Sequence, residues 1–180
     1  TLRSKEFEYT SGAFKADSSD VVIKNEDAAR VSFNSYNVKS RINMDEMLGE
    51  FLANGENIPI VLPYNMYNTT ASEFYWLMND KLINIRLPNE GGYFESTHPD
   101  QGGLKFEASG GVVDLAANTV KVEGIPFIVV ADAKIRPPDT QVFIDPDAEI
   151  RMLEDALMVA DTTNEYHKIY KANIKIKGRN

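Results

Sequence analysis

The stretch GGVVDLAANTVKVEG, residues 110–124, sets the interpretation of the whole chain. Apolar and polar side chains alternate on both sides of Ala116–Thr119, which is typical of two strands joined by a short loop. A four-residue loop at 116–119 gives a register with three cross-strand pairs: Leu115 with Val120, Val113 with Val122, and Asp114 with Lys121. The apolar pairs share one face and the opposite charges share the other. The stretch therefore predicts a hairpin with one buried face.

Three other stretches have the same pattern of strand, turn and strand. They are AFKADSSDVVI (13–23), ADAKIRPPDTQVFI (131–144) and DALMVADTTNEYHKI (155–169). Their turns consist of Asp, Ser, Thr, Asn and Pro, and the third turns at Asp161–Glu165. In the second, the loop at Pro137 and Pro138 pairs Ile135 with Val142 and Ala133 with Ile144. We predict a hairpin in each stretch.

Further strands are predicted by shorter alternating runs: ARVSF (29–33), NVKSRI (37–42), KLINIRL (81–87) and ANIKIK (172–177). Two stretches also fit a short helix. NMDEMLGEFLAN (43–54) fits either structure, and both stay open. PDAEIRMLEDALMVAD (146–161) has apolar residues at helical spacing, but its second half completes a hairpin, so we favour strands over 146–160.

These patterns predict an all-β, antiparallel fold of stacked hairpins, either a jellyroll or a solenoid-like sheet, with at most one or two short helices. The Gly-, Pro- and Asn-rich stretch at 88–103 is the best boundary. It divides the chain into an N-terminal β lobe, 1–88, and a C-terminal β lobe, 89–180, that continues the same sheet. We expect the 180 residues to be a fragment of a longer chain.

Composition narrows the classes of function. The formal net charge is −8, and an acidic surface repels the phosphates of nucleic acids, so no nucleic-acid partner is expected. No apolar run approaches the roughly 20 residues of a transmembrane helix. The chain has no cysteine, which excludes disulfides and Cys-ligated zinc.

Candidate sites for catalysis, cofactors and metals are weak, and we predict none of them. The two histidines, His98 and His167, have no sequence partners at metal-ligand spacing and are interpreted as turn and strand residues. The acidic run at 145–149 could bind calcium weakly, but Ile150 and Ala156 occupy the positions at which an EF-hand loop needs Gly and Glu. No nucleophile elbow, dinucleotide fingerprint or P-loop is present, so we expect the protein not to be an enzyme.

One segment suggests a ligand surface. Residues 58–80 combine aromatic rings with amides, chemistry that suits stacking on sugars or contact with a peptide. The candidate residues are Tyr64, Asn65, Tyr67, Asn68, Tyr75 and Trp76. The alternative is that Tyr75 or Trp76 anchors the core, because EFYWLM (73–78) has the composition of a buried strand.

Residues 104–144, LKFEASGGVVDLAANTVKVEGIPFIVVADAKIRPPDTQVFI, resemble the β-jellyroll rhythm of OstA-type lipopolysaccharide-transport proteins. The stretches at 91–108, 124–135 and 160–179 also resemble long, repetitive, uncharacterised envelope proteins of Gram-negative bacteria. The acidic, aromatic middle region departs from the transport family, and the resemblance carries over no catalytic residue.

The resemblance implies a β-structure of the cell envelope, periplasmic or surface-exposed. Stacked sheets leave open ends, and a piece of a longer chain should expose strand edges there, so we expect a β-structural segment of a larger envelope protein with a scaffolding or assembly role. Its partners would be other segments of the parent chain or other envelope proteins, which it would contact through strand edges. The alternative is a module that binds glycan or lipid through the aromatic and amide residues.

Overall fold

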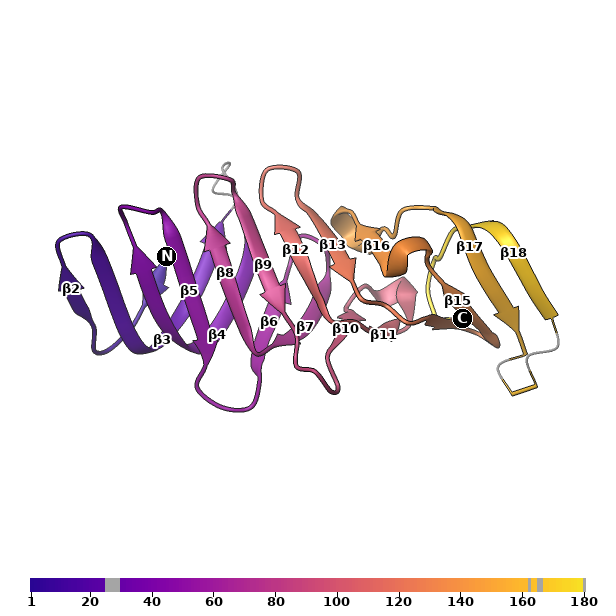
Figure 1. Ribbon diagram of the computed structural model, residues 1–180, viewed down its shortest axis with the longest axis horizontal. Helices are drawn as coiled ribbons and strands as arrows, with labels where there is room; N and C mark the ends of the chain where they lie inside the picture. Colours follow the sequence, from indigo (N-terminus) through magenta and orange to yellow (C-terminus); the bar gives the residue numbers. More distant parts are fainter. Residues whose placement is uncertain (25–29, 162, 165–166, 180) are drawn as a thin grey trace.

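A computed structural model describes residues 1–24, 30–161, 163–164 and 167–179, which form an all-β structure (Figure 1). Fourteen strands make one large antiparallel sheet, and four make a second, smaller one. The described residues contain no α-helix. Their helical segments are three 3-10 turns of three residues each: Pro99–Gln101, Pro138–Thr140 and Pro146–Ala148. The prediction of an antiparallel all-β fold is confirmed.

The large sheet contains β1 (Leu2–Arg3), β2 (Glu8–Thr10), β3 (Ala13–Lys24), β4 (Val31–Asn43), β5 (Leu48–Ala53), β6 (Ile58–Leu62), β7 (Tyr67–Ala71), β8 (Glu73–Leu77), β9 (Leu82–Arg86), β10 (Tyr93–Ser96), β11 (Lys105–Glu107), β12 (Gly110–Asp114), β13 (Thr119–Glu123) and β16 (Gln141–Ile144). The small sheet contains β14 (Ile128–Val130), β15 (Ala133–Arg136), β17 (Leu153–Ala160) and β18 (His167–Ile174).

The large sheet curls on itself into two walls that face each other. We call β2, β5, β8, β9, β12, β13 and β16 the front wall, and β1, β6, β7, β10 and β11 the back wall (Figure 1). The long strands β3 and β4 belong to both walls. In β4, the half Val38–Asn43 pairs with β5, whereas Asn34 and Ser35 pair with β6. The molecule is elongated because the strands lie side by side along its long axis.

The line along which the walls meet, which we call the crease, is held by backbone hydrogen bonds. Ala53 donates to Ser72, Ser72 to Arg86, Leu87 to Ser109, and Ser109 to Glu123, over 2.9–3.1 Å. Where β3 crosses the crease, its register shifts on both sides of Ser19. The buried Ser19 hydroxyl contacts that of Ser40 and lies 3.1 Å from the carbonyl of Val38. Small hydroxyl side chains fit here because the walls approach too closely for larger ones.

Interior side chains form rows that continue from strand to strand, since alternate residues of a strand point to one face. One front-wall row contains Phe14, Ile42, Gly49, Trp76, Ile83, Val113, Val120 and Ile144. A second contains Ala16, Ser40, Phe51, Phe74, Ile85, Gly111, Val122 and Val142. The back-wall row contains Leu2, Val21, Ser35, Ile60, Thr69, Phe94 and Phe106.

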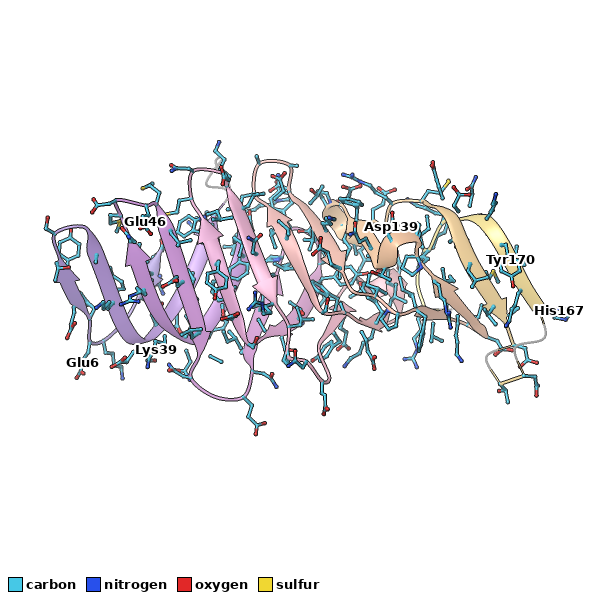
Figure 2. The ribbon with its side chains drawn as sticks, in the orientation of Figure 1. Glu6, Lys39, Glu46, Asp139, His167 and Tyr170 are labelled. Atoms are coloured by element: carbon cyan, nitrogen blue, oxygen red, sulfur yellow. The ribbon has the colours of Figure 1, made fainter. Side chains whose placement is uncertain are left out.

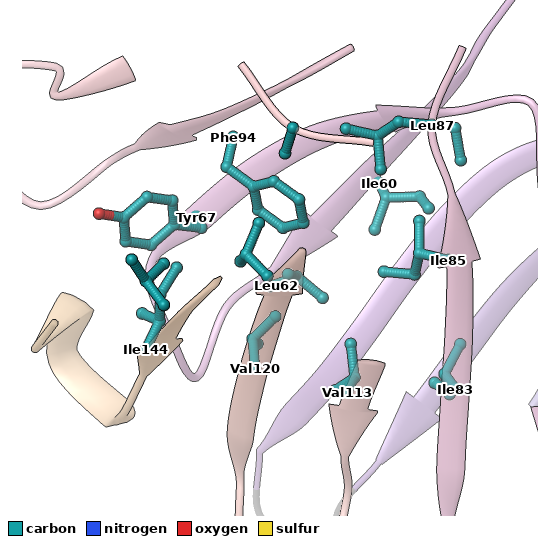
Figure 3. Close-up of a cluster of buried hydrophobic side chains, with 14 of the residues drawn as sticks. Ile60, Leu62, Tyr67, Ile83, Ile85, Leu87, Phe94, Val113, Val120 and Ile144 are labelled. Atoms are coloured by element: carbon teal, nitrogen blue, oxygen red, sulfur yellow. The ribbon is translucent and has the colours of Figure 1, made fainter. Parts of the chain in front are cut away.

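The core is the contact between these rows. Phe33 of the back wall lies 4.8 Å from Phe74 of the front wall, and Phe51 stacks on Phe74 at 4.5 Å, measured between ring centroids. Figure 3 shows Phe94 and Tyr67 facing front-wall residues. Opposite Phe94 the front wall has Gly111, where a Cβ would lie 3.4 Å from the Phe94 ring and 2.9 Å from the Lys121 carbonyl oxygen. Glycine is therefore the residue that lets Phe94 fill the interior.

Four hairpins share one loop geometry. Their closing pairs are Asn43–Leu48, Leu62–Tyr67, Leu77–Leu82 and Asp114–Thr119, each enclosing four residues. The last loop residue has a positive φ in every case: Met47, Met66, Lys81 and Asn118. In two of these loops an Asn or Asp side chain before the loop accepts two loop amides.

The hairpin at 110–124 exists, but its predicted register was wrong by two residues. Val113 pairs with Val120, Gly111 with Val122 and Asp114 with Thr119, so the loop is 115–118. Asn118 takes the left-handed position that ends the loop, and the Asp114 carboxylate accepts the amides of Ala116 and Ala117. The shift is even, so the buried face is the predicted one.

Two predicted hairpins were wrong. In 131–144, β15 pairs with β14 and β17 of the small sheet, whereas β16 joins β13 of the large sheet. Pro137 and Pro138 do lie between strands, but there the chain changes sheets. The stretch 13–23 is one long strand, and its Asp-Ser-Ser-Asp segment is the bend at the crease. Likewise 37–42 and most of 29–33 belong to the single strand β4, with Ala29 outside the described residues.

Most of the other predicted strands are present in the structure. β17 and β18 form the hairpin predicted at 155–169, although Thr162, Glu165 and Tyr166 lie outside the described residues. β9 confirms 81–87 as a strand. The open stretch 43–54 is a turn followed by β5, and 146–160 is a 3-10 turn followed by β17, which confirms the preference for strands there. In 172–177 the strand ends at Ile174, although Ile176 is also buried.

Strands from both sides of residue 88 belong to the large sheet, and β9 pairs directly with β12 across that point. The division into lobes 1–88 and 89–180 stays a prediction.

We expect Phe51→Ala to lower the free energy of unfolding by about 3–5 kcal/mol, because it empties a site between the walls. Its neighbour Leu52 points outward and is exposed, so Leu52→Ala should change stability by no more than about 0.5 kcal/mol. Urea unfolding followed by circular dichroism measures both. Equal effects at 51 and 52 would contradict the assigned interior face.

Candidate functional site

The aromatic and amide residues of the middle region do not form one exposed face. Tyr67 is fully buried, its hydroxyl lies 3.1 Å from Gln101 Oε1, and burial raises the pKa of its phenol. Asn65 is also buried, and its Nδ2 donates to the carbonyls of Asn118 at 2.9 Å and Ile144 at 3.0 Å. Asn65 thereby ties the back-wall loop to the front wall. Both side chains stabilise the fold and offer no surface to a ligand.

The other four candidates lie apart on different elements. Trp76 lies in a front-wall interior row, and its Nε1 is buried without an acceptor among the described residues. Tyr75 points outward on the same strand and donates to Glu73 Oε2 at 2.9 Å, which raises the pKa of the tyrosine. Tyr64 is half-buried in the back-wall loop with the Arg30 guanidinium 5.5 Å from its ring centroid, and Asn68 is exposed on β7. Residues that are adjacent in the sequence, such as Tyr75 and Trp76, point to opposite faces of the sheet because side chains alternate along a strand.

His98 and the acidic run at 145–149 form hydrogen bonds and ion pairs with other residues of this chain. His98 Nδ1 accepts the amide of Asp100 at 3.2 Å at the start of a 3-10 turn. Asp145 forms two hydrogen bonds with Arg151, at 2.7 and 2.8 Å, and Glu149 pairs with Lys175 at 2.6 Å. In the described part of the chain, no group of three or more His, Asp or Glu side chains could hold a metal ion. Nor does that part include a helix that could cross a membrane.

A hollow of about 430 Å³ lies where β11 of the large sheet meets β14 of the small one. Tyr93 and Phe127 lie on its lining, which resembles a site for stacking on a ligand. However, the Lys105 ammonium lies 3.4 Å from the Tyr93 ring centroid and 3.5 Å from the Glu95 carboxylate. The ring is therefore already covered by this chain, and the hollow makes a poor candidate.

The ends of the stack are the surfaces that the fold leaves incomplete. We call β1, β2 and their connection (residues 1–10) the N rim, and β18 (His167–Ile174) the C rim. β1 and β2 pair with β3, and β18 pairs with β17; the outer edges of all three face away from the described strands. Figure 2 shows Glu6 at one end of the molecule and His167 and Tyr170 at the other.

The interior rows of apolar side chains end in exposed residues at both rims. The small-sheet row passes from Ile128 and Ile135, both buried, through half-buried Met158 to Ile169, which is 51% exposed. At the other end, Tyr9 extends the row of Phe14 and is 68% exposed. Phe7 stacks on Phe14 at 5.5 Å and is 61% exposed. Exposure increases along each row because no further strand covers the last residue.

The two rims differ in charge: β18 has two lysines and no acid, whereas the N rim has Glu6 and Glu8 beside Arg3 and Lys5. Residues 167–179 contain five of the 19 Lys and Arg residues and none of the 27 acids. The N rim includes the alternating sequence Glu6-Phe7-Glu8-Tyr9, in which all four side chains are exposed. Glu6, Glu8, Lys168 and Lys171 form no ion pair with the described part of the chain. Sequence reasoning predicted exposed strand edges at the ends but did not identify these residues, although their alternation was visible.

Comparison with protein-family models finds no match, and a search of curated proteins finds none either. The resemblance of residues 104–144 to OstA-type proteins stays a prediction.

Asp145 gives a prediction for the dependence of stability on pH. Its hydrogen bonds from Arg151 lower the pKa of the carboxyl in the folded protein. A carboxylate with a lowered folded-state pKa stabilises the fold above its unfolded pKa of about 3.9, and this stabilisation is lost as the pH falls through the folded pKa. We expect Asp145→Asn to be less stable than the parent at pH 7, and the difference to vanish towards a pH of about 2.

Chemical denaturation at a series of pH values measures this difference. Asp139→Asn, in an exposed turn at another point of the surface, is the control and should change stability little. A deficit of Asp145→Asn that persists unchanged at low pH would show that the lost stability is not that of the ion pair.

Proposed function

We propose that this protein is a non-enzymatic structural segment of a larger cell-envelope protein, and that it joins neighbouring β-structure through its two rims. The observation that supports the proposal is the graded exposure along the interior rows. An interior row that is buried at Ile135 and exposed at Ile169 lacks one covering strand. Open strand edges pair readily with another chain, and such pairing would bury these side chains.

The form of the molecule agrees with an assembly role. Each rim presents extended backbone at an end of the long axis, so a neighbour could extend the stack without disturbing its core. The envelope location rests on the sequence resemblance of residues 104–144. The partners in this proposal are other segments of the parent chain or other envelope proteins.

The alternative of a glycan- or lipid-binding module draws no support from the aromatic and amide residues. Tyr67 and Asn65 are buried, and Trp76 packs against the core.

Photo-crosslinking in the cells that make the protein tests the proposal. A benzoyl-phenylalanine in place of Tyr9 or Tyr170 should give adducts with polypeptide, because each rim would lie against a neighbour. Tyr36, an exposed tyrosine on β4, which is paired on both sides and has no free edge there, is the matched control and should give few. Adducts should also fractionate with the envelope. If positions 9 and 170 crosslink no more than position 36, the rims are not the contact surface and the proposal fails.

A further inference from the structure

The charged side chains at the paired ends differ in sign. The N rim reads Glu6-Phe7-Glu8-Tyr9, of which Glu8 and Tyr9 lie in β2, and the C rim reads His167-Lys168-Ile169-Tyr170-Lys171. Tyr9 extends a row that faces the interior, so Tyr9 points inward and Glu8 outward, and Phe7, just before β2, stacks on Phe14. Ile169 continues an interior row, so Lys168 and Tyr170 point outward.

We propose that the C rim of one copy pairs with the N rim of a second copy, and that the charges of Glu6, Glu8 and Lys168 select this head-to-tail contact. The inference rests on the proposed function, because it requires that rims join to strands. It adds that a second copy of this chain is itself a complementary partner.

An antiparallel register that places Ile169 opposite Phe7 satisfies both faces. On the interior side it covers Ile169 with an aromatic ring and brings His167 opposite Tyr9. On the exterior side it places Lys168 opposite Glu8 and diagonal to Glu6, the positions at which opposite charges stabilise paired strands. Lys171 has a positive φ and lies beyond the paired segment, as does Lys5.

Like rims do not fit together in this way. Two C rims would bring Lys168 and Lys171 together with their counterparts, and two N rims would oppose Glu6 and Glu8. Like charges across a strand pair are unfavourable. The contact is therefore directional. A pair of copies keeps one free N rim and one free C rim, so further copies can join and the contact leads to chains longer than a dimer.

Charge exchange tests the proposal by sedimentation velocity. The parent protein should form species larger than a dimer as its concentration rises to about 500 µM at low salt, and lose them in about 0.5 M NaCl. Glu6→Lys/Glu8→Lys has lysines on both rims, and Lys168→Glu/Lys171→Glu has glutamates at the corresponding positions of both rims, so each variant alone should be monomeric. An equimolar mixture should form alternating chains longer than a dimer, because each rim of one variant meets a rim of opposite charge on the other.

Asp80→Lys/Glu90→Lys is the matched control, since it makes the same change in net charge at exposed positions in loops outside both rims. It should associate as the parent does. A parent protein that stays monomeric at low salt, or variants that fail to associate when mixed, would overturn the inference. If that happens while positions 9 and 170 still crosslink to other proteins in cells, edge pairing stands and only the partner is wrong.

A disulfide trap tests the register independently, because the chain has no cysteine of its own. Oxidation of a mixture of Glu8→Cys and Lys168→Cys copies should give the crosslinked heterodimer, since opposite residues of paired strands approach closely enough for a disulfide. Leu52→Cys, at an exposed position within the front wall, replaces Glu8→Cys in the control. Equal yields from both mixtures would show random collision and contradict the register.

Discussion

A single sheet with one apolar face can bury that face only against another surface, and here the other surface is the same sheet. Every larger feature of the structure depends on this constraint. The strands alternate so that Phe51, Phe74 and their row neighbours face inward, the crease takes serines where the walls converge, and Gly111 leaves room for Phe94. The core is thus a contact between two walls of one ribbon, which needs no helix to cover it.

Because each strand is covered by its neighbours and by the opposite wall, the structure is complete in its middle and incomplete at its ends. Ile83 and Val113 are buried from all sides, whereas Tyr9 and Ile169 occupy equivalent places in rows that stop. The candidate interaction surfaces therefore follow from the architecture itself. In the aromatic middle region, Tyr67, Phe74 and Trp76 contribute volume to the core, whereas Tyr75 points outward.

The sequence allowed the strands to be predicted, since alternation reports the buried face of a strand directly. It did not determine which strands pair. A hairpin of β15 and β16 would keep the same alternation of apolar residues as the observed pairings do, because alternation marks the buried face of a strand and not its neighbour. Asp17–Asp20 has the composition of a turn but lies in a strand, because a crease requires the same small polar residues. At the rims, alternation of charge with apolar residues was visible, but its meaning depended on knowing which strands are last.

The direction of the hydrogen bonds has a mechanical consequence. The strands cross the long axis of the molecule, so the bonds between them lie along it (Figure 1). A force that pulls the rims apart passes through the strand pairs in series, so every pair bears the whole force and the weakest pair separates first. The strand pairs of such a stack separate one at a time, and the molecule lengthens in small steps. Strands aligned with the force would instead share the load between them. A protein of this form is suited to spanning a distance and poorly suited to bearing tension along it.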